Sequence, residues 1–142
     1  MPTKGQIEAA ACTRINAFLQ RRTGRGAGAI TAALHPAFLV VHLKGALTVT
    51  ETNLIAVGKR DGHDSTSLVR AWREQIIRTG QPELVGECEE LLGKKPSSLL
   101  HDVDPESGEE VLVFSFDPGP RTDGARRPAN ATASPDPTRS PT

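Results

Sequence analysis

Apolar residues recur at intervals of three and four near the start of the chain, at Ile7, Ala11, Ile15 and Phe18. This spacing is typical of one face of an amphipathic helix. Thr3 followed by Gln6 has the spacing of a capping box, in which each side chain bonds to the backbone N–H of the other residue. The pattern therefore predicts a helix that begins after Thr3 and ends near Arg22.

The period of the pattern then falls to two, with apolar residues at Ile30, Ala32 and Leu34. Such alternation predicts a strand with one buried face. The dipeptide His35-Pro36 marks a turn, and a β-rich run follows from Phe38 to Leu43. We therefore expect two strands joined at Pro36.

A second capping-box spacing, Thr48 and Glu51, begins the next helix. Apolar residues follow it at Leu54, Ile55 and Val57. A short helix should run to about Lys59, and the polar residues 58–64 should form a solvated loop.

A longer helical stripe follows at Leu68, Trp72, Ile76, Leu84, Cys88, Leu91 and Leu92. Gly80 and Pro82 interrupt this stripe. Because proline lacks a backbone donor and clashes with the preceding turn, we expect a kink or a break there. Gly93 should end the helix, and Trp72 should pack against the sheet.

Two further apolar runs, 98–103 and 111–116, flank the turn residues Pro105-Glu106-Ser107-Gly108 and predict a second hairpin. The expected order of elements is α-β-β-α-α-β-β. Two hairpins separated by helices favour an α+β fold, with one four-stranded antiparallel sheet and helices packed on one face.

The run from Val111 to Phe114 is apolar at consecutive positions, so both faces of this strand need cover. Helices on one face of the sheet would cover only one set of these side chains. Two arrangements would cover the other set: a homodimer, or shielding of the second face by the N-terminal helix.

Residues 118–142 contain six prolines and no Leu, Ile, Val, Met or aromatic residue. Such a segment buries too little apolar surface to offset the entropy lost on ordering it. We therefore expect one α+β domain at residues 1–117, followed by a disordered Pro-rich tail at 118–142.

The chain has 17 basic and 17 acidic residues, so its formal net charge is zero. No global field attracts it to nucleic acid, and we expect no nucleic-acid partner.

Its most apolar run, Ala37 to Val41, is far shorter than the roughly 20 residues of a membrane span. The polar N-terminus does not resemble a secretory signal. Cys12 and Cys88 lie far apart and in no metal-binding spacing, which is typical of reduced, packed thiols. A cytoplasmic location follows.

Closely spaced glycines mark the loop after the first predicted helix. Gly24, Gly26 and Gly28 could let backbone N–H groups converge on an anion, Arg25 would add a fixed charge, and Lys44 is a further candidate. The loop lacks the Lys-Ser/Thr of a P-loop and follows a helix instead of a strand, which excludes a P-loop and a dinucleotide fingerprint. A tight turn that carries the chain off the helix is the other interpretation.

Histidines and acidic residues are weaker candidates for chemistry. No two of His35, His42, His63 and His101 lie three or four residues apart, so the fold would have to gather a metal site. Asp102 and Asp104 would share a strand face, as paired carboxylates do in acid–base sites. No serine lies in a GxSxG motif. The sequence thus indicates no catalytic residue, no metal and no cofactor.

Several segments resemble the MpsC family in order and spacing. They are Thr23-Gly24-Arg25-Gly26, the run from Val41 to Thr48 with Glu51, the run from Glu89 to Gly93, and Ser107-Gly108-Glu109 before Val111 to Phe114. The resemblance spans roughly residues 3–117. The family has proline where this chain has Ala27 and Val49, but the capping box of the second predicted helix survives the latter change.

This family is named after a sodium-translocating, membrane-potential-generating system. The resemblance implies an accessory component linked to membrane ion or inorganic-carbon transport. We therefore favour a non-enzymatic cytoplasmic protein that docks on a membrane transport complex or regulates one, and that is peripheral to the membrane through that partner. The alternative is a small-ligand or anion-binding domain that uses the loop from Gly24 to Gly28. A small hydrolase-type enzyme using Asp102, Asp104 and a histidine is the least favoured.

Overall fold

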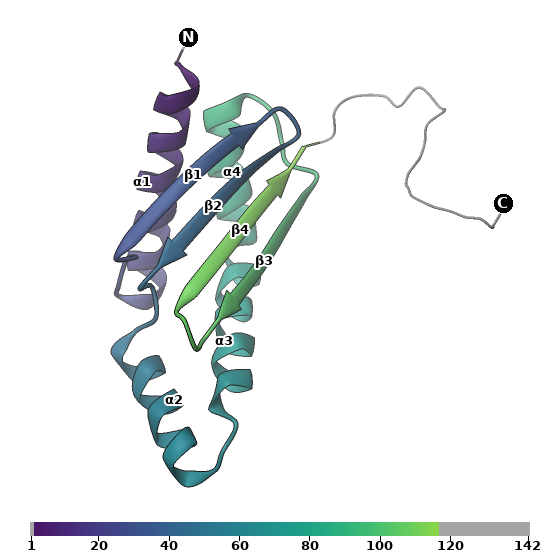
Figure 1. The fold of residues 1–142 in the computed structure, drawn as a ribbon. Coiled ribbons are helices and arrows are strands. Elements are labelled where there is room, and N and C mark those ends of the chain that lie inside the picture. Colours follow the sequence, from purple (N-terminus) through teal and green to yellow (C-terminus); the bar gives the residue numbers. More distant parts are fainter. Residues whose placement is uncertain (1, 117–142) are drawn as a thin grey trace, which may run out of the picture.

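The computed structural model describes residues 2–116, which form a sheet and a layer of helices (Figure 1). The elements are α1 (Lys4–Thr23), β1 (Ala29–His35), β2 (Phe38–Lys44), α2 (Val49–Asp61), α3 (Ser65–Thr79), α4 (Gln81–Leu92), β3 (Ser98–Asp104) and β4 (Glu109–Ser115). Within this range no helix combines the length and the hydrophobicity that crossing a bilayer requires. The predicted α+β class is confirmed, whereas the predicted disordered tail at 118–142 lies outside the described residues.

Capping boxes start α1 and α2, as the sequence predicts. The Gln6 backbone N–H donates to Thr3 Oγ1 at 3.1 Å, and the Thr3 N–H donates to the Gln6 side chain at 2.8 Å. Thr48 and Glu51 form the same pair of bonds at 3.2 Å and 2.8 Å. Gly24 ends α1 at a φ of 83°, a left-handed conformation that glycine adopts without strain.

Both predicted hairpins form, and they join into one antiparallel sheet with the order β1-β2-β4-β3. The central strands β2 and β4 therefore come from different hairpins. Across the sheet, Val40 lies opposite Ala33 on one side and Val113 on the other, and Val113 lies opposite Leu100. This register aligns side chains of all four strands in rows.

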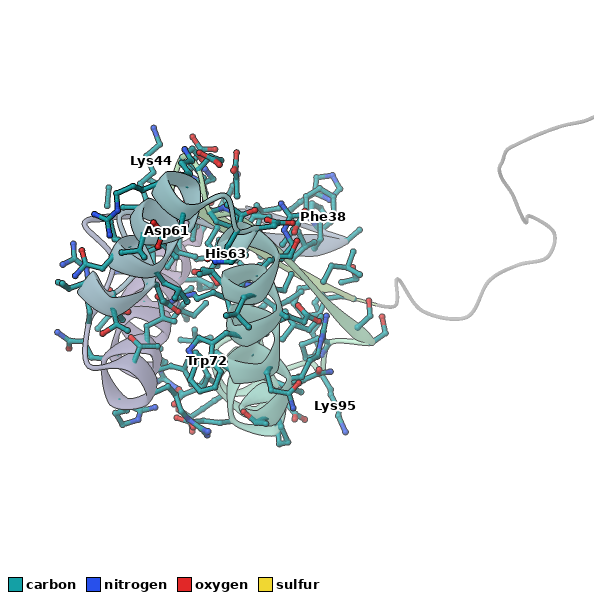
Figure 2. All side chains as sticks on the ribbon, turned by 90° about the horizontal axis from the view of Figure 1, so that it is seen from below. Phe38, Lys44, Asp61, His63, Trp72 and Lys95 are labelled. Carbon is teal, nitrogen blue, oxygen red and sulfur yellow. The ribbon has the colours of Figure 1, made fainter. Side chains whose placement is uncertain are left out.

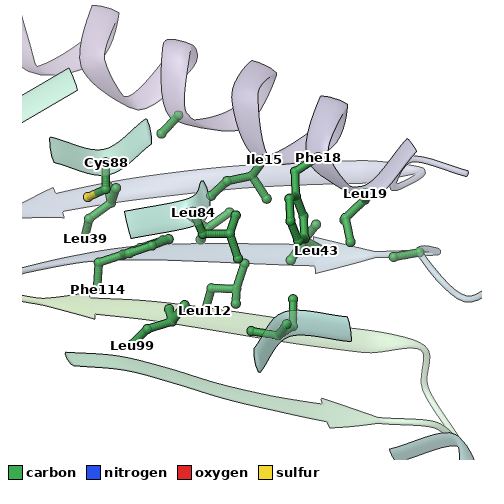
Figure 3. Packing of buried hydrophobic residues seen from close by; sticks show 14 of the residues in the cluster. Ile15, Phe18, Leu19, Leu39, Leu43, Leu84, Cys88, Leu99, Leu112 and Phe114 are labelled. Carbon is green, nitrogen blue, oxygen red and sulfur yellow. The ribbon is translucent and has the colours of Figure 1, made fainter. Parts of the chain in front are cut away.

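Helices α1, α3 and α4 lie on one face of the sheet, and α2 lies beyond its end (Figure 1); α1 packs on β1, α3 packs on β3, and α2 packs on α3. Their apolar side chains interdigitate with alternate strand residues in a core that includes Ile15, Phe18, Leu19, Leu39, Leu43, Leu84, Cys88, Leu99, Leu112 and Phe114 (Figure 3). Burial in this core raises the pKa of the Cys88 thiol to about 12, so Cys88 stays protonated.

The stripe predicted from Leu68 to Leu92 is broken into α3 and α4 at Gly80. The Gly80 N–H donates to the Ile76 carbonyl at 3.1 Å, and the Gly80 carbonyl accepts from the Leu84 N–H at 3.0 Å, so Gly80 ends one helix and begins the next. Pro82 lies in the first turn of α4, where a missing N–H costs nothing. The observed order is thus α-β-β-α-α-α-β-β, with one helix more than the predicted order.

The prediction that Trp72 packs against the sheet is wrong, because its side chain is 59% exposed. The buried face of α3 carries Val69, Arg73 and Ile77 instead. This face lies one residue along from the predicted stripe. The predicted stripe through Trp72 and the buried stripe through Arg73 have the same residue spacing. The bonds of Arg73 with Glu51 and Glu110 favour burial of the second stripe.

The other face of the sheet, called here the open face, carries no helix from residues 2–116 (Figure 1). It consists of the alternate strand residues that include Val40, Val113 and Leu100. Because α1 packs on the helix-covered face, the suggestion that the N-terminal helix shields the second face of β4 is wrong. Leu100 is 57% exposed on the open face.

Gly80 is packed too closely to admit a side chain. A Cβ added there would lie 2.3 Å from the Phe18 ring, whereas one added at Gly86 in α4 would meet nothing within 4 Å. Gly80→Ala should lower the free energy of unfolding by about 1–3 kcal/mol, the usual cost of overpacking. Gly86→Ala should raise it by up to about 1 kcal/mol, because alanine is the better helix former. Urea unfolding of both variants tests this, and equal stabilities would contradict the packing at Phe18.

Candidate functional site

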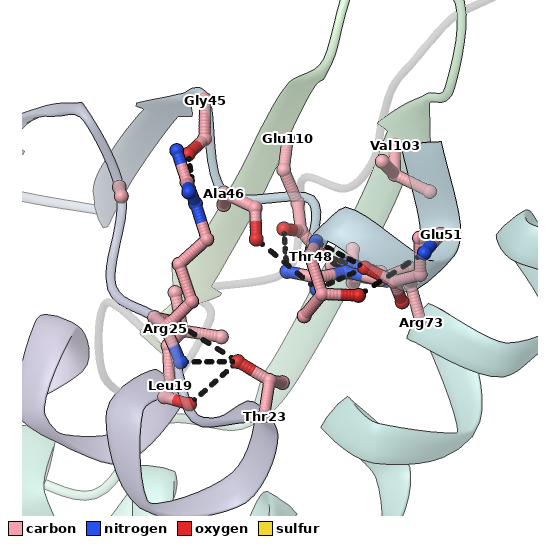
Figure 4. Close-up of polar contacts among 12 residues, drawn as sticks. Leu19, Thr23, Arg25, Gly45, Ala46, Thr48, Glu51, Arg73, Val103 and Glu110 are labelled. Carbon is pink, nitrogen blue, oxygen red and sulfur yellow. Dashed lines mark hydrogen bonds and ion pairs between the residues drawn. The ribbon is translucent and has the colours of Figure 1, made fainter. Parts of the chain in front are cut away.

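A buried cluster of charges lies where α2, α3 and the sheet meet (Figure 4). Arg73 of α3 is 1% exposed and donates to Glu110 of β4 twice, from Nη2 to Oε1 at 2.6 Å and from Nε to Oε2 at 3.3 Å. Its Nη1 donates to Glu51 Oε1 at 3.1 Å and to the Ala46 carbonyl at 3.4 Å. Arg73 therefore ties the first turn of α2 to the sheet.

His101 extends this cluster along β3. Its Nε2 lies 2.6 Å from Glu110 Oε2, and its Nδ1 lies 2.7 Å from Glu74 Oε1. Glu74 also accepts from Arg78 Nε at 2.6 Å. Because each imidazole nitrogen faces a carboxylate, the doubly protonated ring can donate to both carboxylates.

The pKa shifts in this cluster follow from these contacts. Burial would lower the pKa of His101, but its hydrogen bonds to Glu110 and Glu74 outweigh burial and raise it. Burial would raise the pKa of Glu110, but His101 and Arg73 lower it below its ordinary value. The cluster therefore favours a protonated histidine and an ionised carboxylate side by side in the interior.

An apolar groove of about 410 Å³ lies beside the cluster, between α2, α3 and the C-terminal end of α1. The groove is lined by Arg22, Thr23, Thr48, Thr50, Glu51, Leu54, Leu68, Val69, Trp72 and Ile76. In Figure 2, Trp72 lies on the side of α3 that faces the neighbouring helices. Trp72 and Leu68 are 59% and 58% exposed, so the groove presents large apolar side chains to the surroundings.

Glu51 connects the groove with the charge cluster. It lines the groove but is only 5% exposed. Its Oε1 accepts from Arg73 and from the Thr48 N–H, while its Oε2 is buried and has no hydrogen-bond partner among the described residues. A buried carboxylate oxygen without a donor is costly, so the base of the groove holds an unused acceptor.

The loop after α1 uses most of its backbone N–H groups internally. The N–H groups of Gly24 and Gly28 donate to the carbonyls of Gln20 and Lys44 at 2.9 Å and 2.8 Å. The Ala27 N–H donates to the Asn16 side chain at 2.8 Å. The loop thus closes against α1 and the end of β2, and its ability to bind an anion stays a prediction.

The other predicted site residues do not meet in one pocket. Arg25 is exposed, and its Nε donates to the Gly45 carbonyl at 3.2 Å (Figure 4). It lines a cavity of about 420 Å³ with Lys59. Asp102 and Asp104 line a separate cavity of about 530 Å³.

Sequence reasoning identified neither Arg73 nor the groove, although one signal was present. Glu110 shares a strand face with Leu112 and Phe114, which are both buried. Alternation therefore directs the Glu110 carboxylate to the core side, where it requires a buried cation. An arginine in a helix that packs on the sheet is the natural candidate for this cation.

The family comparison covers the described elements from end to end. The family model described as Na+-translocating membrane potential-generating system (MpsC) matches residues 3–118. This chain belongs to the MpsC family. The match extends from the start of α1 past the end of β4, and the predicted resemblance is confirmed.

A similar protein is the uncharacterized protein YbcI of Bacillus subtilis (strain 168). It is 27% identical to this chain over 114 residues, which cover 80% of this chain and 88% of YbcI. No solved structure matches the chain. The similarity to YbcI therefore spans most of both proteins.

Protonation of His101 should stabilise the fold, because the folded protein raises its pKa above the ordinary value of 6.5. This contribution is fully present below the pKa of the unfolded chain and is lost as the pH rises through the higher folded value. The free energy of unfolding should therefore fall as the pH rises above about 6.5, and His101→Gln should remove this dependence. Denaturant unfolding over a pH series measures both. His63→Gln, in an exposed loop, should keep the parent profile, and an unchanged profile in His101→Gln would contradict the assignment.

Proposed function

We propose that this protein is a non-enzymatic accessory protein that docks on a membrane transport system and regulates it. The observation that carries this proposal is the groove with Trp72 and Leu68, which are more than half exposed. Large exposed apolar side chains in a concave site are typical of protein-binding surfaces, where tryptophan is a frequent anchor. The family description, which names sodium translocation and membrane potential, supports a transport system as the partner.

The shape of the groove suits an apolar segment of a partner. Two packed helices form its walls, with Leu54 on α2 facing Leu68 and Trp72 on α3. Amphipathic helices bind in grooves of this kind through a few apolar anchors. The unused acceptor at Glu51 would favour a segment that brings a hydrogen-bond donor to the base of the groove.

We place the protein in the cytoplasm, peripheral to the membrane through its partner. One observation supports this location. Cys12 and Cys88 are both free thiols, which is typical of a reducing compartment. Docking through the apolar groove would bring the protein to the membrane.

Trp72→Ser combined with Leu68→Ser should abolish docking without unfolding the domain. Truncation of central anchors costs about 2 kcal/mol or more in binding. Both side chains are exposed, so we expect a stability change of less than about 1 kcal/mol. The measurement is recovery of the tagged protein with membranes from cells that contain or lack the transport system.

Val49→Ser provides the matched control, because Val49 is 68% exposed on α2 but lies outside the groove lining. This variant should be recovered with membranes like the parent. Recovery of the parent only as a free species, or equal recovery of the groove variant, would argue against docking through the groove.

Anion binding at the loop from Gly24 to Gly28 is a second candidate function. The observation that favours it is the cavity of about 420 Å³ that Arg25 lines, in which Lys59 is paired with Glu106 at 2.6 Å, so that Arg25 would be the main cationic donor. An arginine can bind an oxyanion through two parallel hydrogen bonds. Lys44, whose carbonyl accepts from the Gly28 N–H, would add charge beside the loop.

Arg25→Ala should abolish anion binding while changing the free energy of unfolding by less than about 0.5 kcal/mol, because Arg25 is exposed. Thermal-shift assays with phosphate, bicarbonate and nucleotides measure the binding. Arg60→Ala, which removes an exposed charge from α2, should bind like the parent. If no anion raises the melting temperature of the parent, the loop is only a turn.

A further inference from the structure

The open face of the sheet is organised in rows that run across all four strands. One of its two middle rows, called here the central row, is apolar and consists of Ala33, Val40, Val113 and Leu100, whereas the other consists of Thr31, His42, Val111 and Asp102. The row at the end of the sheet near the β3–β4 turn carries three charges and consists of Ala29, Lys44, Glu109 and Asp104. At the opposite end lie His35, Phe38, Ser115 and Ser98.

This face departs from the usual pattern of a solvated sheet face, in which polar residues occupy the outward positions. Leu100 is 57% exposed, and Val40, Val111 and Val113 extend the apolar surface across the central strands. Phe38 adds an aromatic ring, stacked on His35 with ring centroids 4.2 Å apart. A contiguous apolar surface of this kind marks an interaction site.

We propose that a second copy of this chain packs face to face on the open face, about a two-fold axis that runs parallel to the strands between β2 and β4. This rotation exchanges the two halves of the sheet. It places β2 opposite the partner's β4, and β1 opposite the partner's β3. Each row then faces the same row of the partner in reverse order, as an isologous interface requires.

The sizes of the facing side chains are complementary under this symmetry. In the central row, small Ala33 faces the partner's large Leu100, and Val40 faces the partner's Val113. In the row beside the β1–β2 turn, Phe38 faces the partner's Ser115. Large side chains opposite small ones let two sheets pack at the usual separation of about 10 Å.

The charges are complementary as well. Lys44 faces the partner's Glu109, and the symmetry repeats this pair on the other side of the axis. A two-fold axis perpendicular to the strands and passing through the central row would instead place each central-row side chain opposite its own copy, with Leu100 against the partner's Leu100 and Ala33 against the partner's Ala33. The parallel axis is therefore the one that matches both size and charge.

The segment after β4 is a poor occupant for this face. Residues 118–142 contain no Leu, Ile, Val, Met or aromatic side chain, so they offer no apolar group to cover the central row. The open face also shares no residue with the groove lining, so occupation of the face leaves the groove open. A second copy supplies the apolar surface that the tail lacks.

The mass of the full-length protein in solution, measured by sedimentation equilibrium, tests the proposal. The parent should be a dimer, and Leu100→Lys should halve the mass while circular dichroism shows that the monomer stays folded. The groove variant Trp72→Ser should remain a dimer, so failure of the dimer and failure of groove docking are distinguishable.

A monomeric parent, or a dimer that Leu100→Lys leaves intact, would overturn the proposal. A full-length monomer whose truncation after Asp117 dimerises would show that the tail occupies the face, and it would also overturn the proposal.

A charge exchange tests the orientation. Lys44→Glu should raise the dimer dissociation constant about tenfold, because two attractive pairs become repulsive. Adding Glu109→Lys to this variant should restore the parent value. If the double variant dissociates like the single one, these residues do not face each other.

Crosslinking of mixed variants tests the pairing directly. In a Cys12→Ser background, Ala33→Cys and Leu100→Cys are prepared separately and then mixed with a short bismaleimide. Covalent dimers should form in the mixture and in neither variant alone, because Ala33 faces the partner's Leu100 and not the partner's Ala33. Within one chain the two positions are three strand spacings apart, about 14 Å. Crosslinking in either variant alone would overturn the proposed axis.

Discussion

The structure depends on one buried interaction, the bonds of Arg73 with Glu110 and Glu51. Taking a guanidinium out of water costs several kcal/mol, and the ion pairs offset this cost only while each charged group keeps its partner. Because α3, β4 and α2 each contribute one member, none of these elements can rotate without leaving a charge unpaired in the interior. The cluster therefore fixes the helices to the sheet more tightly than apolar contacts, which tolerate small shifts, would do.

The same interaction creates the groove. Once Arg73 faces the sheet, the neighbouring residue Trp72 must point away from it, because successive side chains on a helix are about 100° apart. A tryptophan can bury roughly 150–250 Å² of surface, worth about 4–6 kcal/mol if fully buried, and the domain leaves more than half of the Trp72 side chain exposed. Binding of a partner in the groove would bury this exposed side chain. The groove and the charge cluster both follow from the orientation of α3, which buries Arg73 and exposes Trp72.

The two proposed interaction surfaces would reinforce each other. A dimer through the open face would keep both grooves accessible, since the groove lining contains no strand residue from that face. Two grooves on one particle would bind a membrane partner with repeated subunits more tightly than either groove alone, because the second contact forms at a high effective concentration. The α+β architecture makes this division of roles possible, since a single sheet presents one face to its own helices and leaves the other free.

The sequence predicted those features that depend on neighbouring residues. The capping boxes, the glycines after α1 and the alternation along β1 act within one turn or one strand, so they indicated where these elements lie. The orientation of α3 could not be predicted in this way, because the stripes through Trp72 and through Arg73 have equal spacing and the apolar one is the better match to a core. The choice between them was made by Glu110, 37 residues further along the chain, whose position opposite α3 exists only in the folded structure. A hydrophobicity pattern describes one helix at a time, whereas a buried ion pair links two elements that are distant in the sequence. Here the ion pair of Arg73 with Glu110 determined which side of α3 became the surface.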